Sequence, residues 1–420
     1  MAIKDFSSYF KKPVFLSAII CLLIFYSGIF SIPERNIPRS LIPSKDFTEI
    51  SGTILSSPAK ISSGKYYSAD FSLNEVKDKR DFFSTASGRL KVYIPAELAE
   101  SFSPGKLSSG NSYLFESGGK YRFTGSNTDK GFYVSECKSS YWPETPSGKL
   151  NHFRSLWRLH FKRLMFGWGE AGGLLLALLC GSREYTNPDT SEAFRRAGLS
   201  HILALSGMHL SMFSSIAIFF GKRTKIKKLT FILRIVTLIC FVWFAGFSPS
   251  LTRAFICAML MIAATIAGAK KPDMLSILCF SFLLQSALCP QDIHNVAFIL
   301  SYGALAGILL TSRFFSIFFT SFLPQSGASS LSAATGAQTF TAPLSLKLFG
   351  SFSPIGIISS VIVSPFITIF IYSGLFLILL SLIFPLLAIP SGIFINFQYT
   401  VINYIVNFFS LVPNISISGA

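Results

Sequence analysis

Long apolar stretches without charge are the feature that most constrains how this chain folds. Residues 14–32 and 352–384 contain no Asp, Glu, Lys or Arg, and several further apolar runs carry none or a single Arg. A run of about 18 such residues is long enough to cross a bilayer. Only 14% of the residues are charged, and the mean hydropathy is +0.53. The sequence therefore excludes a soluble enzyme and predicts a polytopic α-helical membrane protein.

The positions of the basic residues predict how the first span is oriented. Lys4, Lys11 and Lys12 precede residues 14–32, and that run continues into a Pro-rich segment. A secretory signal peptide would instead have a shorter apolar core and a small-residue cleavage site. We therefore expect a retained membrane anchor whose N-terminus lies in the cytoplasm.

Five later apolar runs agree with this orientation. They are residues 198–220, 229–247, 249–269, 274–289 and 293–311. Basic residues follow the first, third and fifth runs, as expected where a chain returns to the cytoplasmic side. Residues 352–384 are either one bent span or two short ones. The sequence thus predicts about eight spans.

Residues 33–146 are a polar region between the anchor and the later spans. Short stretches with partly alternating apolar residues are separated by Gly, Ser, Pro and Asn, which is typical of β-strands. The predicted strands are residues 50–55, 66–76, 88–94, 112–115, 121–124 and 131–135. Such strands predict a small extracytoplasmic β-barrel of the OB-fold type, inserted after the first helix, and a sandwich is the alternative.

Basic and aromatic residues are interleaved in this part of the chain. Residues 33–164 hold 20 basic and 13 acidic residues. The aromatic residues include Tyr66, Tyr67, Tyr93, Tyr121, Phe123 and Tyr133. This combination suits binding of a single nucleic-acid strand by base stacking, without sequence preference. A β-barrel core also needs aromatic side chains, so a structural role stays open.

Residues 147–182 are predicted to connect the polar region to the membrane part. A helix over residues 149–163 has an apolar side that includes Phe153 and Trp157. Its cations are Arg154, Arg158, Lys162 and Arg163. We expect these cations to contact external DNA or anionic lipid. Residues 172–180 are apolar but too short to span, so we expect them to be interfacial or re-entrant.

The most unusual sequence in the membrane part is GLSHILALSGMHL at residues 198–210. Ionisable groups are costly inside a bilayer and usually face a cavity or a partner. On a regular helix His201 and His209 lie about 12 Å apart along the axis, too far to share a metal ion. Ser206 and His209 are close enough to hydrogen-bond. These groups line a polar passage, join helices by hydrogen bonds, or form a Ser–His hydrolase without a nearby acidic residue.

Two further motifs place polar groups in apolar spans. GFSPSLTRAF at residues 246–255 puts Arg253 in the first turns of a span. There it either snorkels to the outer interface or provides a fixed charge at the mouth of an anion passage. GAQTFTAPL at residues 336–344 puts Gln338 ahead of Pro343, which frees backbone carbonyls as in the broken helices of transport sites.

Together these motifs resemble the membrane region of the ComEC-type DNA-internalisation competence family. The resemblance covers roughly residues 165–410. It is carried by LLCGSR at 178–183, FRRAGLSHILALSGMH at 194–209, SPSLTRA at 248–254, FILSYGALAGIL at 298–309 and AQTFTAPL at 337–344. The HILALSGMH core is the most specific part. The order of anchor, external β-domain and membrane bundle also fits the family.

The resemblance implies a channel in the cytoplasmic (inner) membrane of a bacterium, rather than an enzyme, that takes up single-stranded DNA during natural transformation. The positions that match the family as channel-lining or DNA-contact candidates are His201, Ser206, Gly207, His209, Arg253, Gln338 and Pro343. The implied partners are single-stranded DNA, membrane lipid, a separate nuclease, a DNA receptor, and a cytoplasmic motor or single-strand-binding proteins. A homo-oligomer is a further expectation.

Many family members also have a C-terminal metallo-β-lactamase-like domain. This sequence ends at Ala420 and has neither an HxHxDH ligand set nor a CxxC pair. We therefore expect a short form without catalytic metal, cofactor or nuclease activity. The predicted domains are residues 1–32, 33–146, 147–182 and 183–420. The alternatives are a small-molecule permease and an intramembrane Ser/His hydrolase.

Overall fold

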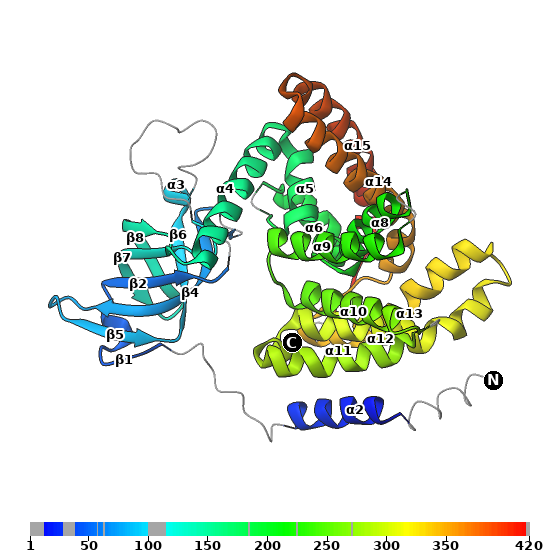
Figure 1. Cartoon of the computed structure of the whole chain (residues 1–420), viewed down its shortest axis with the longest axis horizontal. Coiled ribbons are helices and arrows are strands. Elements are labelled where there is room, and N and C mark those ends of the chain that lie inside the picture. The colour runs from blue at the N-terminus through cyan, green and yellow to red at the C-terminus, as the bar shows by residue number, and fades with distance from the viewer. Residues whose placement is uncertain are drawn as a thin grey trace.

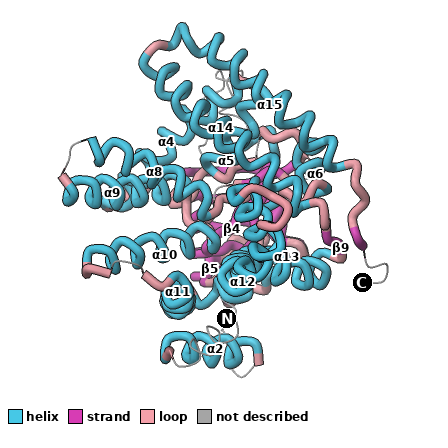
Figure 2. Tube along the Cα trace, turned by 90° about the vertical axis from the view of Figure 1, so that its right-hand side faces the viewer, coloured by secondary structure: helices cyan, strands magenta, loops and turns pink. Residues whose placement is uncertain are grey.

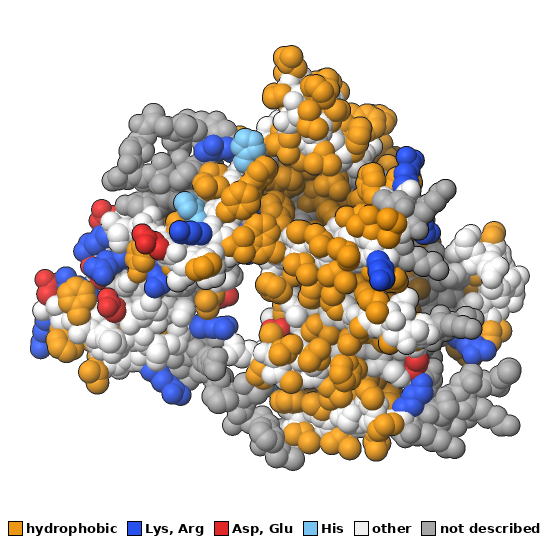
Figure 3. Space-filling model, viewed as in Figure 1, with side chains coloured by type: hydrophobic (Ala, Val, Ile, Leu, Met, Phe, Trp, Pro, Cys, Tyr) orange, Lys and Arg blue, Asp and Glu red, His pale blue; other side chains and the backbone are white. Residues whose placement is uncertain are grey.

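A sheet domain and a bundle of apolar helices make up the computed structural model, and helix α4 (Pro146–Gly167) joins them (Figure 1). The structure describes residues 12–27, 38–56, 58–61, 64–99, 115–183, 185–223, 226–269 and 272–416. The visible face of the sheet domain mixes acidic and basic side chains, whereas that of the bundle is mostly apolar (Figure 3). This contrast is expected where one part meets water and the other meets lipid.

The strands of the sheet domain pair in a closed circuit. They are β1 (Arg39–Ser40), β2 (Glu49–Ile54), β3 (Ala59–Lys60), β4 (Tyr66–Lys77), β5 (Phe83–Ser87), β6 (Arg89–Pro95), β7 (Lys120–Thr128) and β8 (Gly131–Tyr141). Strand β2 pairs antiparallel with β4 and β7, β4 with β6, and β7 with β8. The parallel pair β6–β8 closes the circuit. The short helices η1 (Ser44–Asp46) and α3 (Ala96–Ala99) lie beside these strands in the sequence.

Alternating burial along the strands forms the core of this domain. On β4 every second residue is buried over most of the strand, as the two-residue period of a strand predicts. Phe71, Phe123 and Phe132 are completely buried, and the Phe71 and Phe123 rings lie 5.5 Å apart. The strands predicted at 50–55, 66–76, 88–94, 121–124 and 131–135 match β2, β4, β6, β7 and β8. Residues 112–114 of the remaining predicted strand lie outside the described residues.

The helical part follows the apolar runs. Its helices are α2 (Pro13–Tyr26), α5 (Gly169–Cys180), α6 (Pro188–Arg196), α7 (Ser200–Leu203), α8 (Gly207–Arg223), α9 (Lys227–Ala245), α10 (Pro249–Ile266), α11 (Met274–Leu288), η3 (Pro290–His294), α12 (Val296–Phe319), α13 (Gln325–Phe349), α14 (Gly356–Ile383), η4 (Pro385–Leu387) and α15 (Ala388–Ser410). A short pair, β9 (Ser351–Phe352) with β10 (Ile415–Ser416), completes it. Within the described residues five helices are long and apolar enough to cross a membrane: α9, α10, α12, α14 and α15. The chain is thus a helical membrane protein with a sheet domain.

Two expectations for the bundle change. The single helix predicted over residues 198–220 is wrong, because Ala204 is extended (ψ 135°) and separates α7 from α8. Helix α5 lies inside the bundle rather than at an interface, with every residue from Ala171 to Cys180 buried. A helix that is apolar on all sides is expected in such a position. Most of residues 352–384 form one long helix, α14 (Gly356–Ile383), which runs through Pro365 without ending.

Helices α10, α11 and α12 form a group, and helix α2 packs against α11. Figure 2 shows α10, α11 and α12 grouped below α8 and α9, with α2 beyond α11. The anchor helix α2 is tied to α11 by an ion pair between Lys12 and Asp273. At its other end the Tyr26 hydroxyl donates to the Ile293 carbonyl at 3.1 Å. These contacts make the anchor part of the bundle.

Candidate functional site

The break between α7 and α8 brings Ser206 and His209 together. The Ser206 amide donates to His209 Nδ1 at 3.3 Å, and the Ser206 Oγ lies 3.4 Å from the same nitrogen. Because Nδ1 accepts the amide hydrogen, the ring hydrogen sits on Nε2. His209 is completely buried, and its Nε2 has no hydrogen-bond partner among the described residues. The predicted Ser206–His209 contact is confirmed, and it leaves one buried donor free.

Arg253 lies against the N-terminal end of α8. A Cβ on Gly207, the first residue of α8, would lie 3.6 Å from Arg253 Nη2. Arg253 is 9% exposed. Its Nη1 donates to the Ser301 carbonyl, and the guanidinium is 5.9 Å from the centre of the Tyr302 ring. No carboxylate of the described residues pairs with it, so its charge adds to the partial positive charge of the helix end.

A polar network that sequence reasoning missed lies behind Arg253. Tyr302 donates to Gln285 Oε1 at 3.1 Å. Gln285 Nε2 in turn donates to the Pro249 carbonyl at 3.1 Å and to Asp292 at 3.0 Å. The signal was available, because Gln285 is an isolated amide in an otherwise apolar span. The network fixes α10, α11 and α12 around Arg253.

His201 and Gln338 belong to a second group. The His201 ring hydrogen-bonds the backbone of Gly198. Gly198 adopts φ +75° and touches Gly356, where a Cβ would lie 2.8 Å from Gln338 Nε2. Gln338 Oε1 is buried without a hydrogen-bond partner among the described residues. The bulk that any side chain at Gly356 would add explains why glycine stands there.

Pro343 does not break its helix. Helix α13 continues from Gln325 to Phe349 through Pro343, which is exposed. The hydroxyls of Thr339 and Thr341 bond carbonyls within the preceding turns, to Gly336 at 2.7 Å and to Ala337 at 3.0 Å. The expected broken helix is therefore found between α7 and α8 rather than at Pro343.

The cations predicted on α4 are not at the surface that DNA or lipid contact requires. Arg154, Arg158 and Lys162 are 7%, 2% and 9% exposed, and Arg163 is half-buried. The first three bond to protein groups between the sheet domain and α9. The helix instead exposes apolar residues such as Trp157, which is 50% exposed. The helix is amphipathic as predicted, but its cationic side faces the protein and its apolar side is exposed.

A different basic surface lies on the sheet domain. The lining of an open cavity of about 370 Å³ includes four cations, Lys45, Arg89, Lys91 and Lys130, and one carboxylate, Asp129. Beside it three half-buried tyrosines form an aromatic cluster on β4, β6 and β8. The rings of Tyr93 and Tyr133 are stacked at 4.7 Å, and Tyr66 meets Tyr133 edge-on at 5.4 Å. The turn residue Gly131 joins the two features, since its Cβ would lie 3.1 Å from the Tyr93 ring.

Comparison with known proteins agrees with the motifs. ComE operon protein 3 of Bacillus subtilis (strain 168) is 27% identical over 206 residues, which is 49% of this chain and 26% of that protein. The aligned part thus spans about a quarter of the length of this curated relative. No solved structure matches the chain. The model of the competence protein family matches residues 178–419, more than half of the sequence. The predicted family is confirmed: the chain belongs to the competence protein family.

Proposed function

We propose that the chain takes part in competence DNA uptake by forming a membrane channel for one DNA strand, rather than acting as an enzyme. The observation that carries the proposal is the uncompensated cluster of donors at the start of α8. Arg253 and His209 Nε2 lie in the bundle without an anionic partner among the described residues. A phosphodiester is the type of ligand that such a cluster favours, because guanidinium groups and helix N-terminal ends both stabilise phosphate charge.

The sheet domain favours DNA over a small solute. Single strands bind to proteins that combine cations for the backbone with aromatic rings on which bases stack. Tyr66, Tyr93 and Tyr133 beside the basic cavity supply both features. A permease for small molecules leaves this surface without a role. The closed strand circuit, with its parallel β6–β8 pair, supports an OB-like barrel for this domain.

The membrane arrangement that fits this function has the sheet domain outside. The N-terminus then lies in the cytoplasm, about eight spans cross the inner membrane, and α4 lies along the outer surface with its apolar side toward lipid. A separate nuclease, a DNA receptor, and a cytoplasmic motor or single-strand-binding protein complete the route. The channel is either a single chain or a homo-oligomer.

A hydrolase is a weaker reading of the same residues. Ser206 lies 3.4 Å from His209 Nδ1. No described carboxylate, however, orients the imidazole through Nε2, which lacks a partner. We therefore propose that Ser206 fixes the break in the helix. Ser206→Ala then reduces uptake in part instead of abolishing it.

Uptake of strand-labelled duplex DNA by competent cells tests the channel. Deleting the gene should abolish internal single-stranded label. Arg253→Met should lower uptake about 100-fold and Arg253→Lys about 10-fold, because Lys keeps the charge but not the planar fork of donors. Arg234→Lys is the matched control, since the side chain of Arg234 in α9 donates to the hydroxyl of Ser214, away from Arg253 in sequence. Unchanged uptake after deletion would overturn the proposal in favour of the permease.

A further inference from the structure

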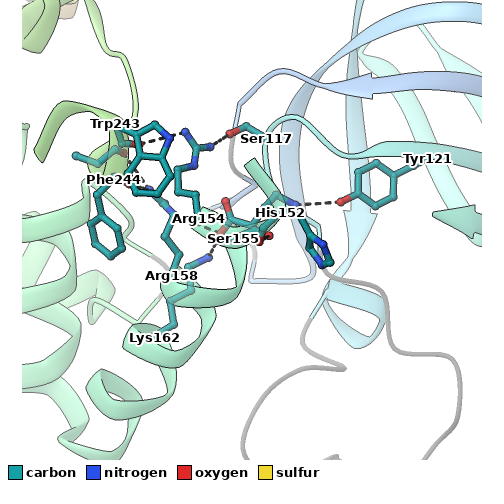
Figure 4. Close-up of polar contacts among 11 residues, drawn as sticks. Ser117, Tyr121, His152, Arg154, Ser155, Arg158, Lys162, Trp243 and Phe244 are labelled. Carbon is teal, nitrogen blue, oxygen red and sulfur yellow. Dashed lines mark hydrogen bonds and ion pairs between the residues drawn. The ribbon is translucent and has the colours of Figure 1, made fainter. Parts of the chain in front are cut away.

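Three cations on α4 face inward at the junction of the sheet domain and the bundle. Arg154, Arg158 and Lys162 are spaced by four residues, so they lie on one side of the helix, about 6 Å apart along its axis. We call these three residues the cation row. Figure 4 shows them between Ser117 on one side and Trp243 and Phe244 on the other. The row therefore contacts two parts of the molecule at once.

On the sheet side the row binds the segment just before β7. Lys162 Nζ donates to Glu116 Oε1 at 2.8 Å, and Arg158 Nε lies 3.5 Å from the same oxygen. Arg154 donates to the Ser117 hydroxyl. Glu116 is only 1% exposed. Its carboxylate is thus held by charged partners inside the junction.

This segment is fixed to the sheet itself. The Gly118 amide donates to the Ile54 carbonyl at 2.8 Å, and the Ile54 amide donates to Gly119 at 3.1 Å. The Glu116 amide donates to the Tyr121 hydroxyl at 3.3 Å. Any displacement of β2 or β7 therefore carries Glu116 with it.

On the bundle side the row binds the last carbonyls of α9. Arg158 Nη1 donates to Phe244 at 2.8 Å and to Ala245 at 3.0 Å, and Arg154 Nη1 donates to Trp243 at 3.3 Å. These carbonyls have no partner within a helix and carry its partial negative charge. The chain then turns at Gly246 (φ +95°) and starts α10. Arg253 follows on the second turn of α10.

The charges of the junction require both sides to be present. Arg158 and Lys162 pair with the buried carboxylate of Glu116, and Arg154 and Arg158 also bond the helix-end carbonyls, which carry partial negative charge. Burial, together with the neighbouring charge of Arg158, lowers the pKa of Arg154. Moving either the sheet domain or α9 away breaks bonds of these buried cations, which is strongly unfavourable. The sheet domain and the α9–α10 turn are therefore expected to move together.

We propose that the cation row is a strut through which the sheet domain positions the α9–α10 turn, and with it Arg253. The three residues act as positioning residues and contact no DNA. This inference rests on the proposed function only in assuming that a DNA strand passes Arg253. It adds that the sheet domain regulates this passage. A ligand that shifts the sheet domain then changes the position of Arg253 without touching the bundle.

Amide hydrogen exchange of the full chain in lipid nanodiscs tests the strut without DNA. In Glu116→Gln and Arg158→Met, exchange of residues 246–253 should rise at least about tenfold, because the turn loses its connection to the sheet. Arg158→Lys should restore part of the protection. Lys149→Met, which removes an exposed cation of the same helix, is the matched control and should match the wild type. Unchanged exchange in β7 shows that the sheet domain remains folded.

The outcome is separable from that of the channel proposal. If residues 246–253 stay as protected in Glu116→Gln and Arg158→Met as in Lys149→Met, the strut is overturned. If β7 loses protection together with the turn even in Arg158→Lys, the row merely holds the fold and the proposal also fails. A raised exchange with normal DNA uptake removes the regulatory role. The exchange is measured without DNA. If the wild type takes up no DNA, the channel proposal therefore fails while the exchange result still tests the strut.

Discussion

The sheet domain and helix α4 place the same residue types on opposite sides. In the sheet, Phe71 and Phe123 are completely buried, while its cavity presents cations to the outside. In α4, Arg158 is buried, and Phe153 and Trp157 are 53% and 50% exposed. The first arrangement suits water and the second suits the edge of a bilayer, where aromatic rings are favoured. The hydrophobic pattern thus predicts which residues share a face, but the surroundings decide which face turns inward.

Truncating one phenylalanine in each region gives the largest expected contrast. Phe123→Ala should cost about 3–5 kcal/mol of unfolding free energy, because it leaves a cavity in the core of the sheet. Phe153→Ala should cost less than about 1 kcal/mol, since its ring is already half exposed. Urea-dependent proteolysis of residues 38–141 and of α4 in the full chain measures both. Equal losses of unfolding free energy at Phe123 and Phe153 would contradict the contrast between the two regions.

Removing one lysine from an ion pair in each region gives a smaller contrast. Lys162→Met should cost about 2–3 kcal/mol, because the buried Glu116 loses the cation at 2.8 Å, while Arg158 lies 3.5 Å away. Lys138→Met should cost less than about 1 kcal/mol, since the Lys138 side chain is 46% exposed and Arg122 also pairs with Glu49. The same proteolysis assay reports both values. A larger cost for Lys138 would show that burial does not set the strength of these pairs.

Fluorescence quenching tests which solvent the exposed side of α4 meets. In nanodiscs, brominated lipid should quench a variant that keeps only Trp157 by more than about twofold. A variant that keeps only Trp142 should be little affected. Trp142 ends the sheet domain and stacks on His152 at 5.1 Å. Equal quenching of Trp157 and Trp142 would contradict the expectation that the apolar side of α4 faces lipid.

Cys137 provides the mildest test, within the sheet core. Burial raises the pKa of its thiol to about 12, and the side chain is 2% exposed. Since the thiolate is the reactive form, maleimide labelling at pH 8 should be about 100-fold slower than in urea. Because the folded pKa is raised, the burial of the neutral thiol stabilises the fold fully below about pH 9 and is lost as pH rises toward 12. Rapid labelling of the native chain would show an open core.

The sequence predicted the elements better than their packing. Residue alternation was enough to locate β2, β4, β6, β7 and β8, because each side of a strand repeats every two residues. It did not predict β1, β3 and β5, which are short and have little pattern of their own. Apolar runs located α9, α10, α12 and α14 for the same kind of reason. They missed the break at Ala204, since no Pro or charged residue marks it.

The candidate site was predicted only in part. The Ser206–His209 contact follows from spacing alone, and the structure has it. The approach of Arg253 to Gly207 and the network through Gln285 depend on contacts between helices far apart in sequence. Spacing carries no information about such contacts. The direction of the cations on α4 was also beyond the sequence, because it is set by Glu116 and the end of α9.

The buried helix α5 has a consequence for how the chain is made. Two of its packing partners, α14 and α15, come late in the chain: Gly374 admits Leu175, and Tyr399 donates to Glu170 at 3.1 Å. Those helices are synthesised roughly 10–40 s after α5 at about 5–20 residues per second. During that interval α5 is too short to span the bilayer and has only part of its final neighbours, among them α4. Assembly of the bundle is therefore expected to end with the C-terminal helices closing around a segment that was synthesised long before them.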